Sequence, residues 1–213
     1  MIVKNDLSQC RLYGFVDTAY LAGRKADDVA RMLVEGGADI IQLRAKKEGR
    51  RVIISMAKAI LSVTRPAGVI LIINDFPSIA REVGADGVHL GQEDLEHEPI
   101  TEVRSLLGSD KIIGISTHSL DQALAAEKFG ADYIGVGPIF PTGTKPGRAA
   151  VGTELIRQVA SSVRIPFVCI GGINQANVFR VKNAGAKWIA VVSAILNAAD
   201  VPATARHFKA AIN

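Results

Sequence analysis

The chain has 213 residues, of which 48% are hydrophobic, and its 25 Lys and Arg against 21 Asp and Glu give a net charge of +4. This composition predicts one globular domain, residues 1–213, and excludes a fibrous or disordered protein. The positive charges are scattered along the chain, which favours small anionic ligands over nucleic acid.

The sequence contains no sign of a membrane protein or a secreted one. Its longest apolar run, residues 188–196, is about half of what a bilayer span requires. The first residues, MIVKNDLSQC, include no apolar segment of the kind that a secretory signal carries. We therefore expect a cytoplasmic protein without a membrane partner, in which Cys10 and Cys169 form neither a disulfide nor a metal site.

Eight apolar runs predict eight strands. In chain order they are residues 11–16, the run in GGADIIQLR from Gly36, residues 69–73, GADGVHL from Gly84, residues 112–115, GADYIGVGP from Gly130, residues 166–170, and GAKWIAVVS from Gly185. In the four quoted phrases a glycine ends an amphipathic stretch, which is typical of the left-handed residue after a helix. Runs that are apolar throughout indicate parallel strands covered by helices on both sides.

Alternating strands and helices of this number predict an α/β protein, a (β/α)8 TIM barrel with about 27 residues per unit. The alternative is an open doubly wound sheet, which would carry a glycine-rich phosphate loop after its first strand. Here the first strand ends in VDTAY, so we favour the barrel. In a barrel the functional side chains follow the carboxyl ends of the strands.

Polar side chains gather at these strand ends. In QLRAK, Gln42, Arg44 and Lys46 occupy alternate positions of an extended chain, so they project to the same side. An arginine at the end of a buried strand indicates an anionic partner.

Two carboxylates follow neighbouring strands, Asp75 in IIND and Asp94 in LGQED. Such a pair suits Mg²⁺, which is held by one or two carboxylates together with substrate phosphates. The alternative is that Asp75 only caps a helix starting at Phe76 and that Asp94 only ends a turn.

The seventh and eighth strands predict a phosphate site. Gly171 and Gly172 follow the seventh strand and Ser193 follows the eighth. Glycines allow backbone N–H groups to approach a ligand, and the loops after these two strands bind phosphate in many barrels. Alternatively, the glycines serve only a tight turn. If the phosphate site is real, the neighbouring loop PTGTK is expected to act as a flap that adds hydroxyl groups and Lys145 to it.

Seven motifs, QLRAK, IIND, HLGQED, GISTHS, VGPIFPTGTK, IGGIN and VVSAI, occur in the order and on the strands of one known family. The chain resembles thiamine-phosphate synthases over nearly its whole length. The resemblance implies that 4-amino-2-methyl-5-hydroxymethylpyrimidine diphosphate condenses with 4-methyl-5-hydroxyethylthiazole phosphate, with Mg²⁺ and by a dissociative mechanism that releases pyrophosphate.

The resemblance also implies roles for individual residues. Arg44, Ser116 and Lys145 would be catalytic, and Asp75 and Asp94 would hold Mg²⁺. The pyrimidine diphosphate would be bound by Gln42, Arg44, Lys46, Asn74, Ser116 and Lys145. The thiazole phosphate would be bound by Thr142, Gly143, Thr144, Gly172, Val192 and Ser193.

The sequence departs from the family pattern at two positions, and it leaves alternatives open. Ala45 stands where the family often has Glu, and Phe76 stands where Asp or Arg is common, which is expected to change the surroundings of Asp75. The sister family of thiazole tautomerases uses a histidine at the position of His118, although PTGTK and both aspartates argue against it. A barrel that only binds a thiazole phosphate is the other alternative. The expected partners are phosphorylated small molecules, and the sequence leaves open whether two copies of the chain form a homodimer.

Overall fold

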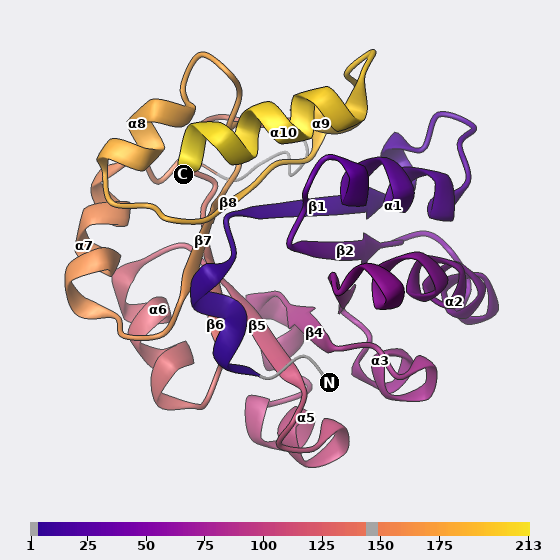
Figure 1. The fold of residues 1–213 in the computed structure, drawn as a ribbon. Coiled ribbons are helices and arrows are strands. Elements are labelled where there is room, and N and C mark those ends of the chain that lie inside the picture. Colours follow the sequence, from indigo (N-terminus) through magenta and orange to yellow (C-terminus); the bar gives the residue numbers. More distant parts are fainter. Residues whose placement is uncertain (1–3, 144–148) are drawn as a thin grey trace.

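The computed structural model describes residues 4–143 and 149–213, and it contains a closed barrel of eight parallel strands in chain order, with β8 pairing with β1. This confirms the predicted TIM barrel (Figure 1). The strands are β1 (Leu12–Asp17), β2 (Ile40–Arg44), β3 (Ile70–Asn74), β4 (Gly87–Leu90), β5 (Ile112–Thr117), β6 (Tyr133–Val136), β7 (Phe167–Ile170) and β8 (Ile189–Ala190).

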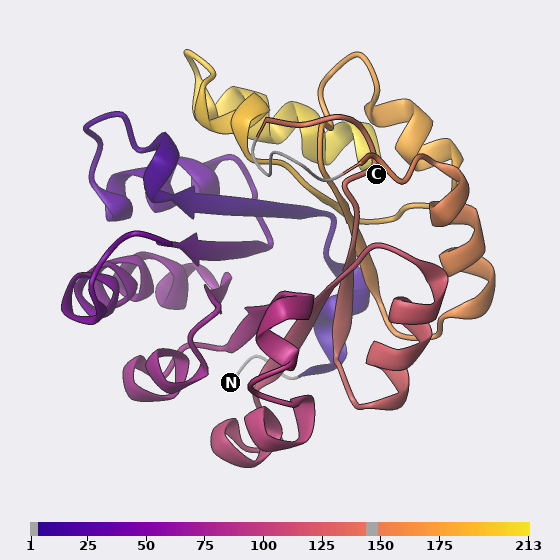
Figure 2. The ribbon, with the colours of Figure 1, turned by 180° about the vertical axis from the view of Figure 1, so that it is seen from behind.

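Helices surround the strands in both views of the ribbon (Figures 1 and 2). None in the described segments is long and apolar enough to cross a membrane. They are α1 (Ala26–Glu35), α2 (Arg50–Ala67), α3 (Pro77–Val83), α4 (Gln92–Leu95), α5 (Ile100–Leu107), α6 (Leu120–Lys128), α7 (Glu154–Ser162), α8 (Val178–Asn183), α9 (Ser193–Leu196) and α10 (Val201–Ile212), with the 3-10 helices η1 (Lys4–Gln9) and η2 (Thr18–Tyr20).

The predicted glycine signal marks the helix ends with one shift. Gly84, Gly130 and Gly185 have φ of +67°, +93° and +110°, as expected for the left-handed region. In the first phrase the left-handed residue is Gly37, with φ +80°, and not Gly36. Gly36 is small for another reason, because a Cβ there would lie 2.4 Å from the Cβ of Ala205 in α10.

The aspartate in three of the four repeated phrases joins the starts of adjacent strands at the amino end of the barrel. Each carboxylate accepts a hydrogen bond from a backbone N–H of the preceding strand. The pairs are Asp39 Oδ2 with Arg11 (2.9 Å) and Leu12 (3.0 Å), Asp86 Oδ2 with Leu71 (2.8 Å), and Asp132 Oδ2 with Ile113 (2.8 Å). The repeated phrase therefore encodes a strand connection as well as a helix end.

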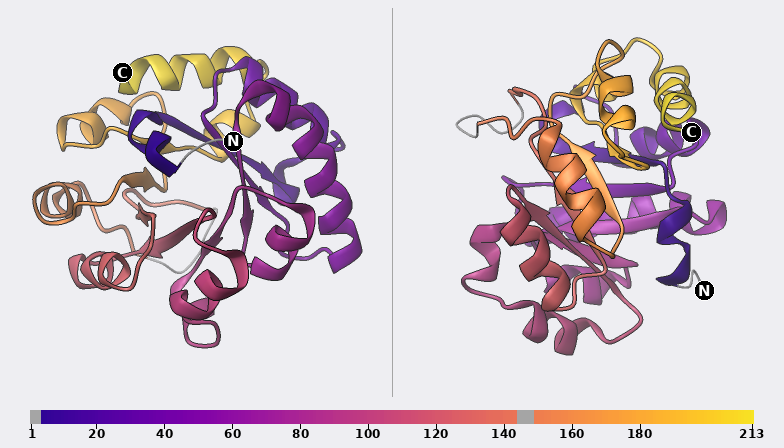
Figure 3. Two further views of the ribbon diagram at one scale, coloured as in Figure 1. Left: turned by 60° about the horizontal axis from the view of Figure 1, so that its bottom comes forward. Right: turned by 90° about the vertical axis from the view of Figure 1, so that its left-hand side faces the viewer.

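The fourth phrase has Lys187 in place of this aspartate. A carboxylate from α6 instead binds the segment that leads into β7, where Glu127 Oε1 accepts from the N–H groups of Arg164 (2.7 Å) and Ile165 (3.0 Å). At the same end of the barrel η1 lies across the strands, on the side away from their carboxyl ends (Figure 3, right). This arrangement leaves the carboxyl ends of the strands open for a site.

Candidate active site

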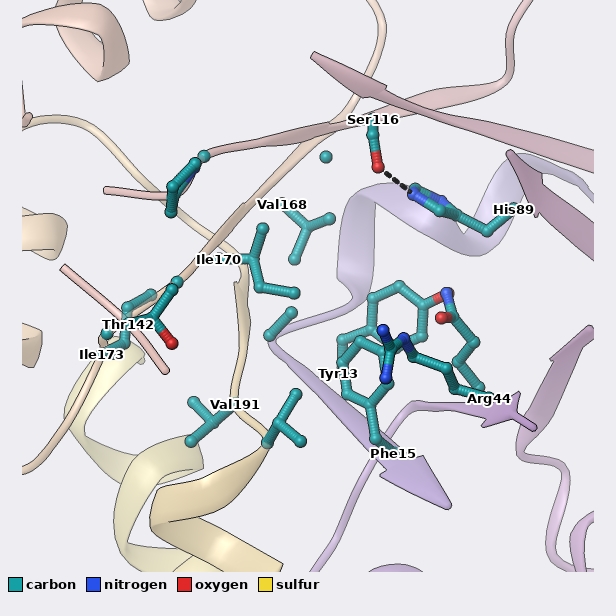
Figure 4. A pocket seen from close by; sticks show the side chains of 18 of the residues that line it. Tyr13, Phe15, Arg44, His89, Ser116, Thr142, Val168, Ile170, Ile173 and Val191 are labelled. Atoms are coloured by element: carbon teal, nitrogen blue, oxygen red, sulfur yellow. Dashed lines mark hydrogen bonds between the residues drawn. The ribbon is translucent and has the colours of Figure 1, made fainter. Parts of the chain in front are cut away.

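A pocket opens at the carboxyl ends of the strands, and residues from all eight strands line it (Figure 4). The space between the lining residues is about 910 Å³, including the part that is open to solvent. In Figure 4 Arg44 enters the pocket from β2, while Thr142 lies across from it beside Ile173. The barrel topology thus brings together side chains that are far apart in the sequence.

The three side chains of QLRAK that were predicted to project to the same side do not all reach the pocket. Gln42 and Arg44 line the pocket, whereas Lys46 lies beyond the strand end with its side chain 49% exposed. Arg44 Nη1 donates to Asp17 Oδ2 over 2.8 Å, because the parallel register places these two residues side by side on β1 and β2. Asp17 is only 1% exposed, so this ion pair fixes the guanidinium group at the wall of the pocket.

The two carboxylates predicted to hold Mg²⁺ are neighbours. Burial raises the pKa of Asp94 above its ordinary value, and the adjacent Asp75 carboxylate raises it further, although the N–H of Gly91 and the charge of Lys46 act in the opposite direction. Gly91 N donates to Asp94 Oδ2 over 2.7 Å, so Asp94 also closes a turn. A turn at Asp94 was the alternative to a metal-binding role. Lys46 Nζ lies 3.0 Å from Asp75 Oδ2.

Asp75 does not cap the following helix. That helix, α3, begins at Pro77, and its N-cap residue is Phe76, which makes no side-chain capping bond. Asp75 has φ +64°, an uncommon value for a residue with a side chain, and its N–H bonds to the carbonyl of His89. Two adjacent carboxylates fit Mg²⁺ that also takes phosphate oxygens, and the described residues contain no cluster of three or more His, Cys, Asp and Glu that would form a protein-only cage.

Asn74 and Ser116 line the pocket between β2 and the loop after β6. Ser116 Oγ lies 3.0 Å from His89 Nε2, and Gln92 Nε2 donates to the carbonyl of Ser116 over 2.6 Å. The serine is therefore held at both its side chain and its backbone. Figure 4 shows the His89 contact as a dashed line.

The predicted phosphate ligands lie on the β6–β8 side of the pocket. Thr142, Gly172, Val192 and Ser193 line it, whereas Gly143 is exposed and does not. No hydrogen bond between described residues uses the N–H groups of Gly172, Val192 or Ser193, which leaves three donors for an anion. Thr144 and Lys145 fall outside the described residues, so their roles and the flap stay predictions.

His118 also lines the pocket. Its ring atom Nδ1 is hydrogen-bonded to the carbonyl of Gly137, and its backbone N–H donates to Gln122 Oε1 over 2.8 Å. The ring is therefore fixed at the start of the β6 loop.

The interpretation of the sequence missed the floor of the pocket. Tyr13 and Phe15 lie there with their ring centroids 5.4 Å apart, and Tyr133 reaches across the barrel from β6. The signal was present in LYGFVD, where Tyr13, Phe15 and Asp17 alternate and so share the inner face of β1. Aromatic residues in a buried strand usually pack in the core, so this pattern alone does not indicate a ligand site.

Comparisons with known proteins agree with one another. The family model described as thiamine monophosphate synthase matches residues 12–195. The thiamine-phosphate synthase of Shouchella clausii is 46% identical over 203 residues, covering 95% of this chain and 96% of that protein. That of Chloroflexus aurantiacus is 46% identical over 204 residues, covering 95% and 93%.

Solved structures give the same picture. The thiamine phosphate pyrophosphorylase from Pyrococcus furiosus superposes with a TM-score of 0.86 at 35% identity, covering 97% of this chain and 96% of that one. A geranylgeranylglyceryl phosphate synthase from Thermoplasma acidophilum shares the fold, with a TM-score of 0.73 at 18% identity.

Proposed function

This chain belongs to the thiamine monophosphate synthase family and is an enzyme, a transferase of thiamine biosynthesis, and on that premise we propose its substrates and mechanism. It joins 4-amino-2-methyl-5-hydroxymethylpyrimidine diphosphate to 4-methyl-5-hydroxyethylthiazole phosphate. The products are thiamine phosphate and pyrophosphate.

One observation carries the proposal. The side chains expected to bind the pyrimidine diphosphate and the groups expected to bind the thiazole phosphate line two sides of one pocket. The first set includes Gln42, Arg44, Asn74 and Ser116, and the second includes Thr142, Gly172, Val192 and Ser193. One pocket that takes both substrates is what a condensation needs, since holding two reactants in the right geometry can remove about 7–11 kcal/mol of the barrier.

The reaction proceeds by departure of the leaving group first. The bond from the pyrimidine methylene carbon to oxygen breaks, and its electron pair leaves with pyrophosphate. The lone pair of the thiazole nitrogen then forms the new C–N bond. Arg44, fixed by Asp17, stabilises the charge that grows on the leaving group, and we assign the same role to Lys145. Phe15 and Val168 line the pocket with apolar surface and limit the access of water, which would otherwise capture the cation.

Mg²⁺ is the expected cofactor, and Asp75 and Asp94 are the residues that would hold it. Their adjacency and their position beside Lys46 suit an ion shared with a diphosphate. When bound, the ion would supply positive charge that neutralises the departing pyrophosphate.

The decisive experiment combines purified protein with both phosphorylated substrates, with Mg²⁺ or with EDTA, and measures thiamine phosphate and pyrophosphate. We expect the two products in equal amounts, and only with Mg²⁺. Isomerisation of a thiazole carboxylate phosphate without any condensation would instead identify a tautomerase. Binding of the thiazole phosphate without either reaction would identify a barrel that only binds.

A further inference from the structure

A chain of hydrogen bonds crosses the interior of the barrel beneath the pocket. It runs from Gln42 Nε2 to Tyr13 OH (2.9 Å), Tyr133 OH (2.8 Å), His89 Nδ1 (2.9 Å) and, from His89 Nε2, to Ser116 Oγ (3.0 Å). Its two ends, Gln42 and Ser116, line the pocket and belong to the set expected to bind the pyrimidine. We call Tyr13, Tyr133 and His89 the relay.

The backbone is shaped to admit this relay. His89, Gly114 and Tyr133 are aligned in register on β4, β5 and β6, so they face the barrel interior in one row. A Cβ on Gly114 would lie 2.1 Å from Tyr133 Cζ and 2.4 Å from its hydroxyl oxygen. Only glycine at this position lets the ring of Tyr133 pass over β5 toward His89.

Each phenol of the relay has one proton to donate, and so has the imidazole of His89 in its neutral form. Burial raises the pKa of Tyr13 and of Tyr133 above the ordinary value for tyrosine, so both phenols keep their protons at neutral pH. A phenol or a neutral imidazole in such a chain accepts on one side and donates on the other. Any other arrangement leaves a buried O–H without an acceptor, which is costly. All the protons in the relay therefore point in the same direction.

The amide of Gln42 sets that direction, because its Nε2, which can only donate, lies against Tyr13 OH. The distances alone leave the donors of the other three contacts open, and the orientation of Gln42 decides them. Tyr13 then donates to Tyr133, Tyr133 donates to His89 Nδ1, and His89 donates from Nε2 to Ser116. Two groups then remain for a ligand. Gln42 Oε1, which accepts no hydrogen bond from a described residue, offers an acceptor, and the hydroxyl hydrogen of Ser116 is available as a donor.

We propose that the relay fixes the hydrogen-bonding character of Gln42 and Ser116 jointly, so that the site selects an amino-substituted azine and rejects its oxo counterpart. An aminopyrimidine offers N–H donors next to a ring nitrogen acceptor, which matches an acceptor at Gln42 and a donor at Ser116. A 4-oxopyrimidine offers the reverse pattern. This inference rests on the proposed function for the identity of the ring, and Tyr13, Tyr133 and His89 are positioning residues within it.

The direction of the relay can be read without any substrate. The chain has four histidines, and ¹⁵N-labelled histidine gives separate signals for protonated and unprotonated ring nitrogens. A His89→Gln variant identifies the signal of His89. We expect a neutral ring with its proton on Nε2, and a proton on Nδ1 or a doubly protonated ring would overturn the proposal.

The selectivity is tested by binding of 4-amino-2-methyl-5-hydroxymethylpyrimidine monophosphate and of its 4-oxo counterpart, measured by calorimetry. The wild-type protein should bind the amino form roughly tenfold more tightly. Tyr133→Phe, which keeps the ring but cuts the relay, should bring this ratio close to one and leave the affinity for inorganic pyrophosphate with Mg²⁺ unchanged. Tyr20→Phe, a tyrosine outside the pocket lining, should keep the wild-type ratio.

Several outcomes contradict the relay. A wild-type ratio near one, or a Tyr133→Phe variant with the wild-type ratio, would overturn it. Tyr13→Phe repeats the test at the other end if Tyr133→Phe does not fold, as judged by its circular dichroism. Failure of the proposed function is recognised separately, because condensation by the wild-type protein is a different measurement and the tautomer of His89 does not depend on it.

Discussion

Lys46 Nζ lies 3.0 Å from Asp75 Oδ2, so a carboxylate expected to hold Mg²⁺ is paired with a lysine expected to bind the diphosphate. Without ligands the two charges neutralise each other. When a magnesium diphosphate binds, Mg²⁺ would replace Lys46 as the partner of Asp75, and the diphosphate would replace Asp75 as the partner of Lys46. Each group would therefore keep a partner of opposite charge. In the ligand-free protein each of these two charges thus has a partner of opposite sign.

The first prediction concerns this carboxylate. Asp75→Asn should lower kcat about a hundredfold or more, because an amide holds Mg²⁺ far less well. Its melting temperature should change little, since Asp75 lies at the mouth and not in the core. Asp110→Asn, at an exposed aspartate, is the matched control. Near-normal kcat for both Asp75→Asn and Asp94→Asn at limiting Mg²⁺ would contradict the metal assignment.

The ion pair of Arg44 and Asp17 predicts an effect on stability. Arg44→Met leaves the buried Asp17 carboxylate unpaired, which should lower the free energy of unfolding by about 3 kcal/mol. The double variant Asp17→Asn, Arg44→Met should lose less, because no charge is then left alone. Urea unfolding measures both, and a single variant as stable as the wild type would show that the pair is not structurally coupled.

Substituting an aspartate at the amino end of the barrel should lower stability and leave turnover unchanged. Asp86→Ala removes the acceptor of the Leu71 N–H, so the free energy of unfolding should fall by about 1–3 kcal/mol. Turnover by the folded variant should equal that of the wild type, since Asp86 lies at the end of the barrel away from the pocket. Chemical denaturation with Asp110→Ala as control decides the point. Equal midpoints for the two variants would mean that the strand connection is not needed.

Sequence patterns predicted the barrel because the signals for its strands and helices come from residues that are close together in the sequence. Apolar runs and helix-ending glycines depend on neighbouring residues, and the polar residues after each strand reach one mouth by topology alone. The relay is different in kind, since Tyr13 and Tyr133 are 120 positions apart and each belongs to an apolar run. Nothing in either run distinguishes a tyrosine in the core from one that orients a ligand.

The same limit applies at the strand ends. Alternation placed Gln42, Arg44 and Lys46 on one side, but the strand stops at Arg44, so Lys46 turns away toward Asp75. The ion pair of Arg44 with Asp17 could not be predicted either, because the two residues become neighbours only through the register of β1 and β2. The residue types were readable from the sequence, and their pairing required the structure.

His118 distinguishes the synthase from a tautomerase. Its ring is bonded to the carbonyl of Gly137, a positioning contact, so His118→Ala should reduce condensation by less than the roughly 10²–10⁴-fold expected for a general base. Steady-state kinetics with both substrates measures this. A larger loss, together with isomerase activity that disappears in the variant, would favour the tautomerase.

The last prediction tests the phosphate side of the pocket. Gly172 has φ +64°, and a Cβ there would lie 2.6 Å from the carbonyl oxygen of Pro141 and 2.8 Å from Phe140 Cβ. Gly172→Ala must therefore displace the segment that carries Thr142, at a cost of about 1–3 kcal/mol in backbone strain. Because this segment and Gly172 itself line the β6–β8 side, KM for the thiazole phosphate should rise more than KM for the pyrimidine diphosphate. Gly49→Ala is the control, since no atom lies within 4 Å of a Cβ at Gly49 and its φ is −71°. Equal KM changes for the two substrates would show that Gly172 supports the barrel mouth as a whole and has no particular role in binding the thiazole phosphate.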